Sequence, residues 1–418
     1  MNPLLKTHSF QPVVWLWAAW VVILLNFQWL VPARLQLQRP DNVLEWTAKE
    51  TTAGSQKDKP YLNDPFLNDH VAWDSEFYLS IATVGYDDPA VRSIGPKDQQ
   101  HTLSYAFLPF YPLATRLVAF PLRILGLTPI ATSTLAAVIV SALGTLAGMI
   151  ALYDLVKEEL GGEGGLRAAF YLIAFPSGFF LAQVYTEGLF VGLAFGCLAL
   201  IRRKHLVWAA VLAALATWTR AVGIALVIPL AIPWLQAGEW IDLDLEWKQI
   251  YFQGLPWRAI GRGLIAFAPM VAFFVWRMSY LGAGFSLVEE SYFGRGFLSL
   301  GTTFYTWSLA FESLFGSNPQ RTAYYLIEFG AVILGFVACF ATWRRYRGVA
   351  WFSLAVVLLS FTSGPAQGMH RYVLGAPSVF IALSQWGQRP AFDRAWTILS
   401  ILLMGLIATL FTFDMWAG

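Results

Sequence analysis

The chain has 418 residues, of which 57% are hydrophobic and 13% are charged. An ordinary soluble domain carries about 25% charged residues, so this chain has too few charges to cover a water-facing surface, which excludes a soluble enzyme and a disordered chain. The formal net charge of +2 provides no basic field that could hold a polyanion, which excludes a nucleic-acid binder. The composition predicts a polytopic membrane protein.

The first apolar run, at about 13–31, is predicted to be an uncleaved membrane helix. It is longer than the apolar region of a signal peptide, and no small-residue cleavage site follows it. A polar stretch, residues 32–104, comes next and contains no spanning run. Further apolar runs lie at about 106–127, 130–153, 168–183, 188–201, 206–217, 222–235, 264–281, 324–343, 349–361, 372–386 and 396–413.

The run at 106–127 differs from the others because it contains three prolines and two arginines. We expect it to be broken or to lie on the membrane surface rather than to cross once. The glycine-rich segment 161–165 is expected to be a flexible turn. With these assignments, the chain is predicted to be one all-α membrane domain, residues 1–418, with about 11 transmembrane helices and a large first external loop, residues 32–104.

The orientation follows from Lys and Arg in short loops, because these residues mark the cytoplasmic side. The clusters that set it are Arg202-Arg203-Lys204, Arg344-Arg345-Tyr346-Arg347 and the pair Arg389 and Arg394. With these clusters inside, the polar loop 32–104, the turn at 185–187, the loop at about 282–320 and the turn at 364–371 lie outside. The distinctive polar motifs are therefore predicted on the outer face.

The first motif surrounds Asp74, in the order His70, Trp73, Asp74, Glu76 and Tyr78. An amphipathic helix here would lie at the membrane surface, with Trp73 and Tyr78 as interfacial anchors. It would hold Asp74 at the boundary of water and lipid, where a carboxylate can accept a proton from a hydroxyl. The alternative is a solvated carboxylate that caps a surface helix. His70 and Asp74 are four residues apart, but one pair does not make a metal site.

The second motif is Tyr185-Thr186-Glu187. Glu187 is the only charged residue between Arg167 and Arg202, and a carboxylate at membrane depth is costly unless it is paired or faces water. In the alternative interpretation, Thr186 caps the next helix and Glu187 supports its first turn. The two interpretations are compatible.

A third set consists of lone cations in apolar surroundings: Arg220, Arg295, His370 and Arg371. A guanidinium near a membrane interface suits a phosphate, because it can make paired charge-assisted hydrogen bonds. The alternative for each is snorkelling toward lipid headgroups. Arg371 is the best candidate, because it lies on the predicted outer side, where positive charge is disfavoured.

Patterns typical of cofactor sites are absent from the sequence. There is no His-Glu-x-x-His, no Gly-x-Ser-x-Gly and no glycine-rich nucleotide fingerprint. The sequence therefore predicts neither a metal nor another cofactor.

The motifs occur in an order that is more specific than any one of them. That order is Trp73-Asp74 with Phe77-Tyr78, Phe107-Leu108-Pro109-Phe110-Tyr111-Pro112, Phe175-Pro176-Ser177 with Phe179-Phe180, Tyr185-Thr186-Glu187, Thr219-Arg220, and Arg371-Tyr372 with Pro377. It resembles the PIG-V family, the GPI mannosyltransferase 2 group and its prokaryotic relatives. The resemblance runs from about Trp73 to Pro377.

The resemblance implies a GT-C glycosyltransferase fold, a helical bundle with an acidic residue in the first external loop. It implies an inverting mannosyltransferase that uses a polyprenyl- or dolichyl-phosphate mannose donor and a lipid- or glycan-linked acceptor on the external face. Asp74 would be the catalytic base, and Glu76 would bind sugar hydroxyls or assist Asp74. The external loops lack large eukaryote-like insertions, which suggests a prokaryotic protein of the cytoplasmic membrane; a eukaryotic member would lie in the endoplasmic reticulum membrane.

The remaining site residues receive their roles from the same resemblance. Arg371 would neutralise the leaving lipid phosphate, with His370, Arg220 and Arg295 as further candidates. Tyr185 and Glu187 would position the acceptor or brace the site, and Trp73 and Tyr78 would also bind substrate. The expected partners are the lipid-linked donor, a glycan or glycolipid acceptor and membrane lipids, without nucleic acid.

A multi-pass transporter or lipid flippase is the main alternative, with Glu187 and Arg220 as binding charges inside the membrane. Such folds often show a sequence echo between their halves, and none is found here. A large loop directly after the first helix also fits a transporter poorly. A membrane scaffold without catalysis would leave the ordered acidic and basic motifs unexplained.

Overall fold

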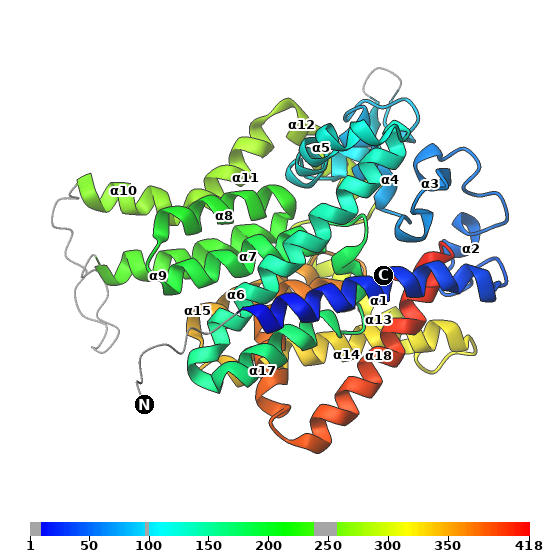
Figure 1. Ribbon diagram of the computed structural model, residues 1–418. Helices are drawn as coiled ribbons and strands as arrows, with labels where there is room; N and C mark the ends of the chain where they lie inside the picture. The colour runs from blue at the N-terminus through cyan, green and yellow to red at the C-terminus, as the bar shows by residue number, and fades with distance from the viewer. Residues whose placement is uncertain (1–9, 97–99, 238–256) are drawn as a thin grey trace.

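The computed structural model describes residues 10–96, 100–237 and 257–418, and the fold is built almost entirely of helices (Figure 1). The α-helices are α1 Gln11–Arg34, α2 Thr47–Glu50, α3 Pro60–Asn63, α4 Ser75–Thr83, α5 Phe110–Leu122, α6 Pro129–Ile173, α7 Glu187–Arg202, α8 Leu206–Thr219, α9 Val227–Ala237, α10 Trp257–Ala266, α11 Ala268–Met278, α12 Tyr280–Ser291, α13 Leu300–Ser313, α14 Pro319–Thr342, α15 Arg347–Phe361, α16 Met369–Tyr372, α17 Pro377–Trp386 and α18 Pro390–Thr412. The 3-10 helices are η1 Asn68–His70, η2 Leu103–Ala106, η3 Arg123–Leu125, η4 Gly178–Ala182, η5 Ala221–Leu226 and η6 Val373–Gly375, and the antiparallel strands β1 Ser93–Ile94 and β2 His101–Thr102 form one small hairpin.

Four of the described helices, α1, α6, α14 and α18, are long and apolar enough to cross a membrane, and the bent pair α11 and α12 would add a fifth span. The protein is therefore an integral membrane protein with an all-helical fold, but the predicted eleven spans are not confirmed. Several predicted spans are short helices. The 14 residues of α8 and the 15 of α15 reach only about 21–23 Å at 1.5 Å per residue, less than the roughly 30 Å of a hydrocarbon core.

Helix α6 is the longest element, and it breaks at Gly161, inside the segment predicted to be a turn. Gly161 has a φ of +74°, in the left-handed region that glycine occupies without a steric penalty. The turn is thus a local break between two helical stretches rather than a long flexible loop.

Helices α6 and α7 pack backbone against backbone, and this contact places the start of α7. A Cβ on Gly144 would lie 2.6 Å from the carbonyl oxygen of Gly188, and one on Gly192 would lie 2.4 Å from the carbonyl oxygen of Gly144. Only glycine permits such an approach. The start of α7, where Glu187 is the first residue, is therefore held against Ser141 and Gly144, about a third of the way along the long helix.

The segment predicted as a large external loop is folded into short elements (Figure 1), and its buried apolar residues form one cluster with residues of α5 and α6. Its link to the membrane helices runs through Gln28 of α1, whose side chain donates to the Asp69 carbonyl at 2.9 Å and accepts from the Gln183 side chain at 2.9 Å. Gln183 also contacts Nδ1 of His70 at 3.0 Å. Burial lowers the pKa of His70 to about 4, so His70 is a neutral member of this network rather than a partner of Asp74.

The segment at 106–127 forms only α5 and η3, and the 13 residues of α5 are too few for a span. One side of α5 exposes Leu117 and Phe120, whereas Tyr111 is buried. The guanidinium of Arg116 donates to the carbonyls of Ile81 and Ala82 at 2.7 and 2.8 Å, at the end of α4. This agrees with the expectation that the segment is broken rather than one simple span.

The region predicted as an external loop at 282–320 is largely helical, because it contains most of α12 and all of α13. Helix α12 follows α11 with a bend of 89°. The side chain of Ser279 caps α12 by accepting the N–H of Gly282 at 3.2 Å.

Candidate active site

Asp74 is the residue that precedes α4, but its carboxylate does not cap that helix. Instead, Oδ2 of Asp74 accepts a charged hydrogen bond from Nη1 of Arg371 at 3.1 Å, and the carboxylate side chain is 25% exposed. The Asp74 N–H donates to the Tyr185 hydroxyl at 3.2 Å, and that hydroxyl donates to the Ala72 carbonyl at 3.1 Å. The interpretation of Asp74 as a solvated helix cap is therefore wrong, and Tyr185 fixes the backbone that carries it.

Arg371 bridges two carboxylates. Besides its bond to Asp74, its Nε lies 3.3 Å from Oε1 of Glu187, and the Arg371 side chain is 8% exposed. The guanidinium also lies over the rings of Phe180 and Tyr185, at 5.5 and 5.1 Å from their centroids. Burial lowers the pKa of Arg371, but Glu187 and Asp74 raise it by more, so the pKa lies well above its ordinary value and Arg371 stays charged.

Glu187 is the first residue of α7, and its Oε1 also accepts a charged hydrogen bond from Nη1 of Arg220. The hydroxyl of Thr186 accepts from the same Arg220 nitrogen at 3.2 Å, and it makes no capping bond to α7. The predicted cap is thus absent, and the motif serves a buried ion cluster. Two cations, Arg220 and Arg371, share one carboxylate.

Tyr372 lies at the centre of the predicted cations, and the sequence analysis did not single it out as a site residue. Its ring centroid is 5.0 Å from the Arg220 guanidinium, 5.1 Å from that of Arg295 and 5.2 Å from that of Arg371. Arg295 is held by the Ser363 hydroxyl at 3.0 Å and the Gln367 carbonyl at 3.2 Å. Three guanidinium groups from three segments therefore meet at one aromatic ring, where cation–π attraction favours them.

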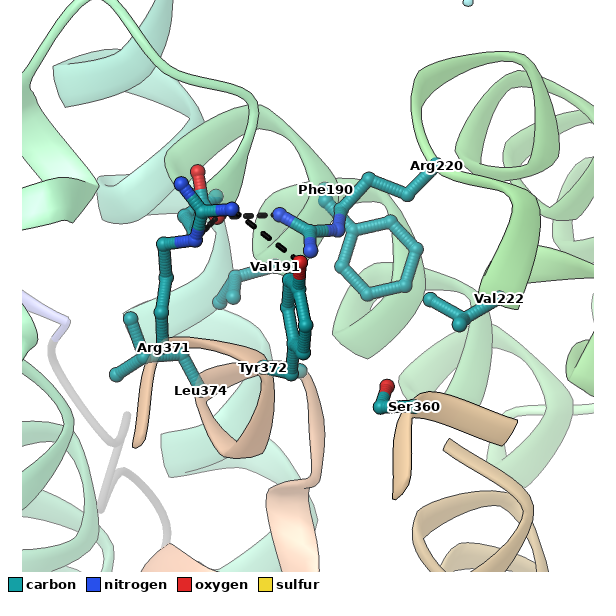
Figure 2. Close-up of a pocket in the computed structure, with 10 residues that line it drawn as sticks. Phe190, Val191, Arg220, Val222, Ser360, Arg371, Tyr372 and Leu374 are labelled. Atoms are coloured by element: carbon teal, nitrogen blue, oxygen red, sulfur yellow. Dashed lines mark hydrogen bonds and ion pairs between the residues drawn. The ribbon is translucent and has the colours of Figure 1, made fainter. Parts of the chain in front are cut away.

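A recess with about 250 Å³ of empty space opens beside this cluster. Figure 2 shows Tyr372 between Arg371 and Arg220 at its edge. The residues that line the recess are Glu187, Phe190, Val191, Arg220, Val222, Ser360, Arg371, Tyr372, Leu374 and Gly375. One part of the lining is charged and the rest is mainly apolar.

Tyr78 interacts electrostatically with Asp74, Glu187 and Arg220 of the ion cluster, whereas Trp73 is held by other contacts. The ring of Tyr78 is buried and packs edge-on against Phe107 and Tyr111, so its prediction as an interfacial anchor is wrong. The indole of Trp73 donates to the Met415 carbonyl at 3.1 Å. Trp73 also packs with two further tryptophans, Trp46 and Trp416, which contact each other as well.

Glu76 is buried on the other side of α4 from Asp74 and interacts electrostatically with Lys59 and Arg92. Burial raises its pKa from 4.5 to about 7, although both cations act to lower it. The folded protein therefore holds this proton over a pH range where the unfolded chain has lost it, and stability falls as the pH rises from about 4.5 to about 7.

We expect Glu76→Gln to stabilise the protein by up to about 3 kcal/mol above pH 7 and by nothing below pH 4.5. The measurement is thermal unfolding in detergent at pH 4.5, 6 and 8, compared with the wild type. An equal difference at all three pH values would contradict the buried, protonated carboxyl.

His370 is also outside the ion cluster, and it leads to a residue that the sequence analysis missed. Burial lowers the pKa of His370, so it is neutral and cannot neutralise a phosphate. The backbone N–H of His370 donates to one carboxylate oxygen of Glu328 at 3.1 Å, and the backbone N–H of Gly368 donates to the other at 2.6 Å. The hydroxyl of Ser177 donates to the His370 carbonyl. Glu328 and Ser177 thus clamp the peptide just before Arg371.

Glu328 is fully buried in α14, and its signal in the sequence was a single carboxylate inside the apolar run 324–343. A buried charge of this kind is retained when it has a specific partner. The partner here is the backbone of the turn that carries Arg371.

We expect Glu328→Gln to lower the turnover number about 10- to 100-fold, because an amide can accept only one of the two N–H groups and the turn before Arg371 shifts. The loss of one buried charged hydrogen bond also costs about 1.5–3 kcal/mol of stability. Initial rates and unfolding midpoints measure the two effects. Glu312→Gln, at an exposed glutamate of α13, is the control, and equal behaviour of the two variants would contradict the clamp.

Across the three described stretches, no group of three His, Cys, Asp or Glu side chains is placed to hold a metal ion. The candidate site is instead built from carboxylates and guanidinium groups. Glu289 of α12 belongs to its surroundings, because it interacts electrostatically with Arg295 and Asp74.

Fold and site together define a helical integral membrane protein with an ion cluster beside a small recess. The sequence profile of the family described as mannosyltransferase (PIG-V) matches residues 19–280, which is more than half of the chain. The chain belongs to the mannosyltransferase (PIG-V) family, and glycosyl transfer is the class of reaction that this membership indicates. Asp74, Glu187 and Arg220 lie inside the matched region, whereas Arg295 and Arg371 follow it. A search of curated proteins found no match.

Among solved structures, the chain is similar to ArnT from Cupriavidus metallidurans bound to undecaprenyl phosphate, with 14% identity, a TM-score of 0.46, and coverage of 95% of this chain and 76% of ArnT. For ArnT without ligand the values are 15%, 0.47, 95% and 75%. The apo oligosaccharyltransferase of Archaeoglobus fulgidus matches at 12% identity and a TM-score of 0.41, over 96% of this chain and 56% of that chain.

Proposed function

We propose that the protein is an inverting mannosyltransferase of the GT-C type. It moves mannose from a polyprenyl- or dolichyl-phosphate mannose donor to a lipid- or glycan-linked acceptor on the external face of the membrane. Family membership supports sugar transfer. The observation that carries the mechanism is the contact between the partly exposed carboxylate of Asp74 and the buried guanidinium of Arg371.

Asp74 is the general base in this mechanism. Its carboxylate takes the proton of the acceptor hydroxyl while that oxygen forms a bond to C1 of mannose. The bond between C1 and the phosphate oxygen breaks, and the lipid phosphate leaves with the electron pair. Attack from the face opposite the phosphate inverts the configuration at C1. The leaving group is a stable anion, so no general acid is required.

Arg371 has two roles in this proposal. Its guanidinium pairs with the Asp74 carboxylate and so positions that carboxylate. It also stabilises negative charge on the departing phosphate, together with Arg220 and Arg295. Phosphate and Asp74 compete for the same guanidinium, so donor binding would release the carboxylate toward the acceptor.

The other predicted substrate contacts are reassigned in this proposal. Tyr185 positions Asp74 through its backbone, and His370 is part of the clamp on Arg371. Trp73, Glu76 and Tyr78 support the fold of the external segment.

The test is a transfer assay with purified protein. Radiolabelled polyprenyl-phosphate mannose and a set of membrane glycolipid acceptors should yield mannosylated acceptor and free polyprenyl phosphate in equal amounts, with the product anomer inverted. A protein that never consumes the donor would contradict the proposal.

The same donor in proteoliposomes tests the transporter alternative. Movement of the intact lipid-linked sugar across the bilayer, without chemical conversion, would favour a flippase. The described pairing of Glu187 with two arginines supports a fixed site rather than a mobile binding charge.

A further inference from the structure

The two carboxylate oxygens of Glu187 differ in their surroundings. Oε1 forms ion pairs with the guanidinium groups of Arg220 and Arg371. Oε2 is buried and has no hydrogen-bond partner among the described residues. The side chain is 3% exposed. A hydrogen-bond acceptor buried without a donor is unfavourable, and native proteins contain few of them. We therefore expect this oxygen to accept a hydrogen bond from a group outside the chain.

The recess limits which group can donate this hydrogen bond, because Glu187 is one of its lining residues. Phe190 and Leu374 provide apolar surface, while Arg220 and Arg371 provide positive charge (Figure 2).

A ligand that fits must therefore combine a hydroxyl donor, an apolar face and a nearby anion. A sugar ring linked to phosphate has all three. In the proposed mechanism, Asp74, which pairs with Nη1 of Arg371, takes the proton of the acceptor hydroxyl. Glu187 pairs with Nε of Arg371 instead, so the hydroxyl that reaches Glu187 comes from the sugar donor.

We propose that Oε2 of Glu187 accepts a hydrogen bond from one hydroxyl of the sugar that is transferred, and that this contact selects the donor sugar. The inference rests on the proposed function and adds a specificity-determining residue to it. Glu187 binds the substrate in this role and makes or breaks no covalent bond. A donor that lacks the recognised hydroxyl leaves the carboxylate oxygen unpaired, which disfavours its binding.

The experiment compares the wild type on polyprenyl-phosphate mannose and on the matching 2-, 3-, 4- and 6-deoxymannose donors. We expect one deoxy donor to lose about 10- to 100-fold in kcat/KM, the range for a hydrogen bond to a charged group. The other three serve as controls and should change little. The wild-type series needs no variant and therefore cannot fail through misfolding.

The Glu187→Gln variant completes a double-mutant cycle. Its amide cannot accept at the same position if the NH₂ group replaces Oε2, so the sensitive donor should no longer differ from mannose. Asp58→Asn, at an exposed carboxylate of the external segment, should retain the wild-type ratio. If Glu187→Gln does not fold, Glu187→Asp keeps the charge and withdraws the oxygens by one methylene.

The possible results separate failure of this inference from failure of the proposed function. Transfer of mannose with equal rates for all deoxy donors would overturn the inference and leave the proposed function intact. A sensitive donor that remains equally sensitive in the Glu187 variants would also overturn it, because another group would then recognise the hydroxyl. No transfer from any donor by the wild type would overturn the proposed function itself.

Discussion

Asp74→Asn is expected to remove sugar transfer while the protein remains folded. The asparagine keeps the size of the side chain and can still accept from Arg371, but it cannot take a proton from the acceptor hydroxyl. General-base catalysis contributes about 10²- to 10⁴-fold, so kcat should fall by at least about 100-fold. The measurement is initial mannose transfer at saturating donor and acceptor, with the unfolding midpoint measured on the same preparation.

A matched variant separates chemistry from a general loss of charge in the external segment. Asp58→Asn changes an exposed carboxylate of the same segment and should transfer at the wild-type rate. A folded Asp74→Asn variant with near-normal kcat would show that Asp74 is not the base.

Arg371→Met is expected to abolish transfer and to destabilise the protein as well. It removes the cation between Asp74 and Glu187 and leaves Asp74 without a partner near the phosphate site. Breaking a buried pair by deleting one partner typically costs about 3–5 kcal/mol, and Glu187 retains Arg220, so a loss near the lower end, about 3 kcal/mol, is expected. Transfer rates and denaturant unfolding measure the two effects.

The double variant Arg371→Met with Asp74→Asn distinguishes the two roles of Arg371. Removing the charge of Asp74 as well should recover part of the lost stability, because no unpaired carboxylate remains at that position. Transfer should stay absent, since both the base and the cation are gone. Recovery of activity, or no recovery of stability, would contradict the pairing of these two side chains.

The residue types of the site could be predicted from the sequence because each is rare in its surroundings. The charged candidates lie at the ends of apolar runs, where a charged side chain is costly unless it is paired or faces water. They are Asp74, Glu187, Arg220 and Arg371. Their grouping could not be predicted. Asp74 and Arg371 are 297 positions apart, and no spacing rule joins residues that far apart.

Other residues were missed because their meaning depends on a partner. In the sequence, Glu328 is only one carboxylate in an apolar run. Its role follows from the two hydrogen bonds that it accepts from the backbone of the turn that carries Arg371. Tyr372 was visible only as the neighbour of Arg371, and its contacts with Arg220 and Arg295 come from the folded chain. Tyr78 was predicted to be an interfacial anchor because helical periodicity does not reveal which segments cover a surface helix.

That the chain lies in a membrane follows from its composition alone, because 13% charged residues cannot cover a soluble protein of this size. The sequence also predicted the helical class and the short set of charged candidates. The tertiary structure decided how many helices are long enough to span and which candidates meet. The physical reason is that hydropathy acts residue by residue along the chain, whereas an ion pair such as Asp74 and Arg371 depends on distance in space, which the packing of α4, α7 and α16 sets.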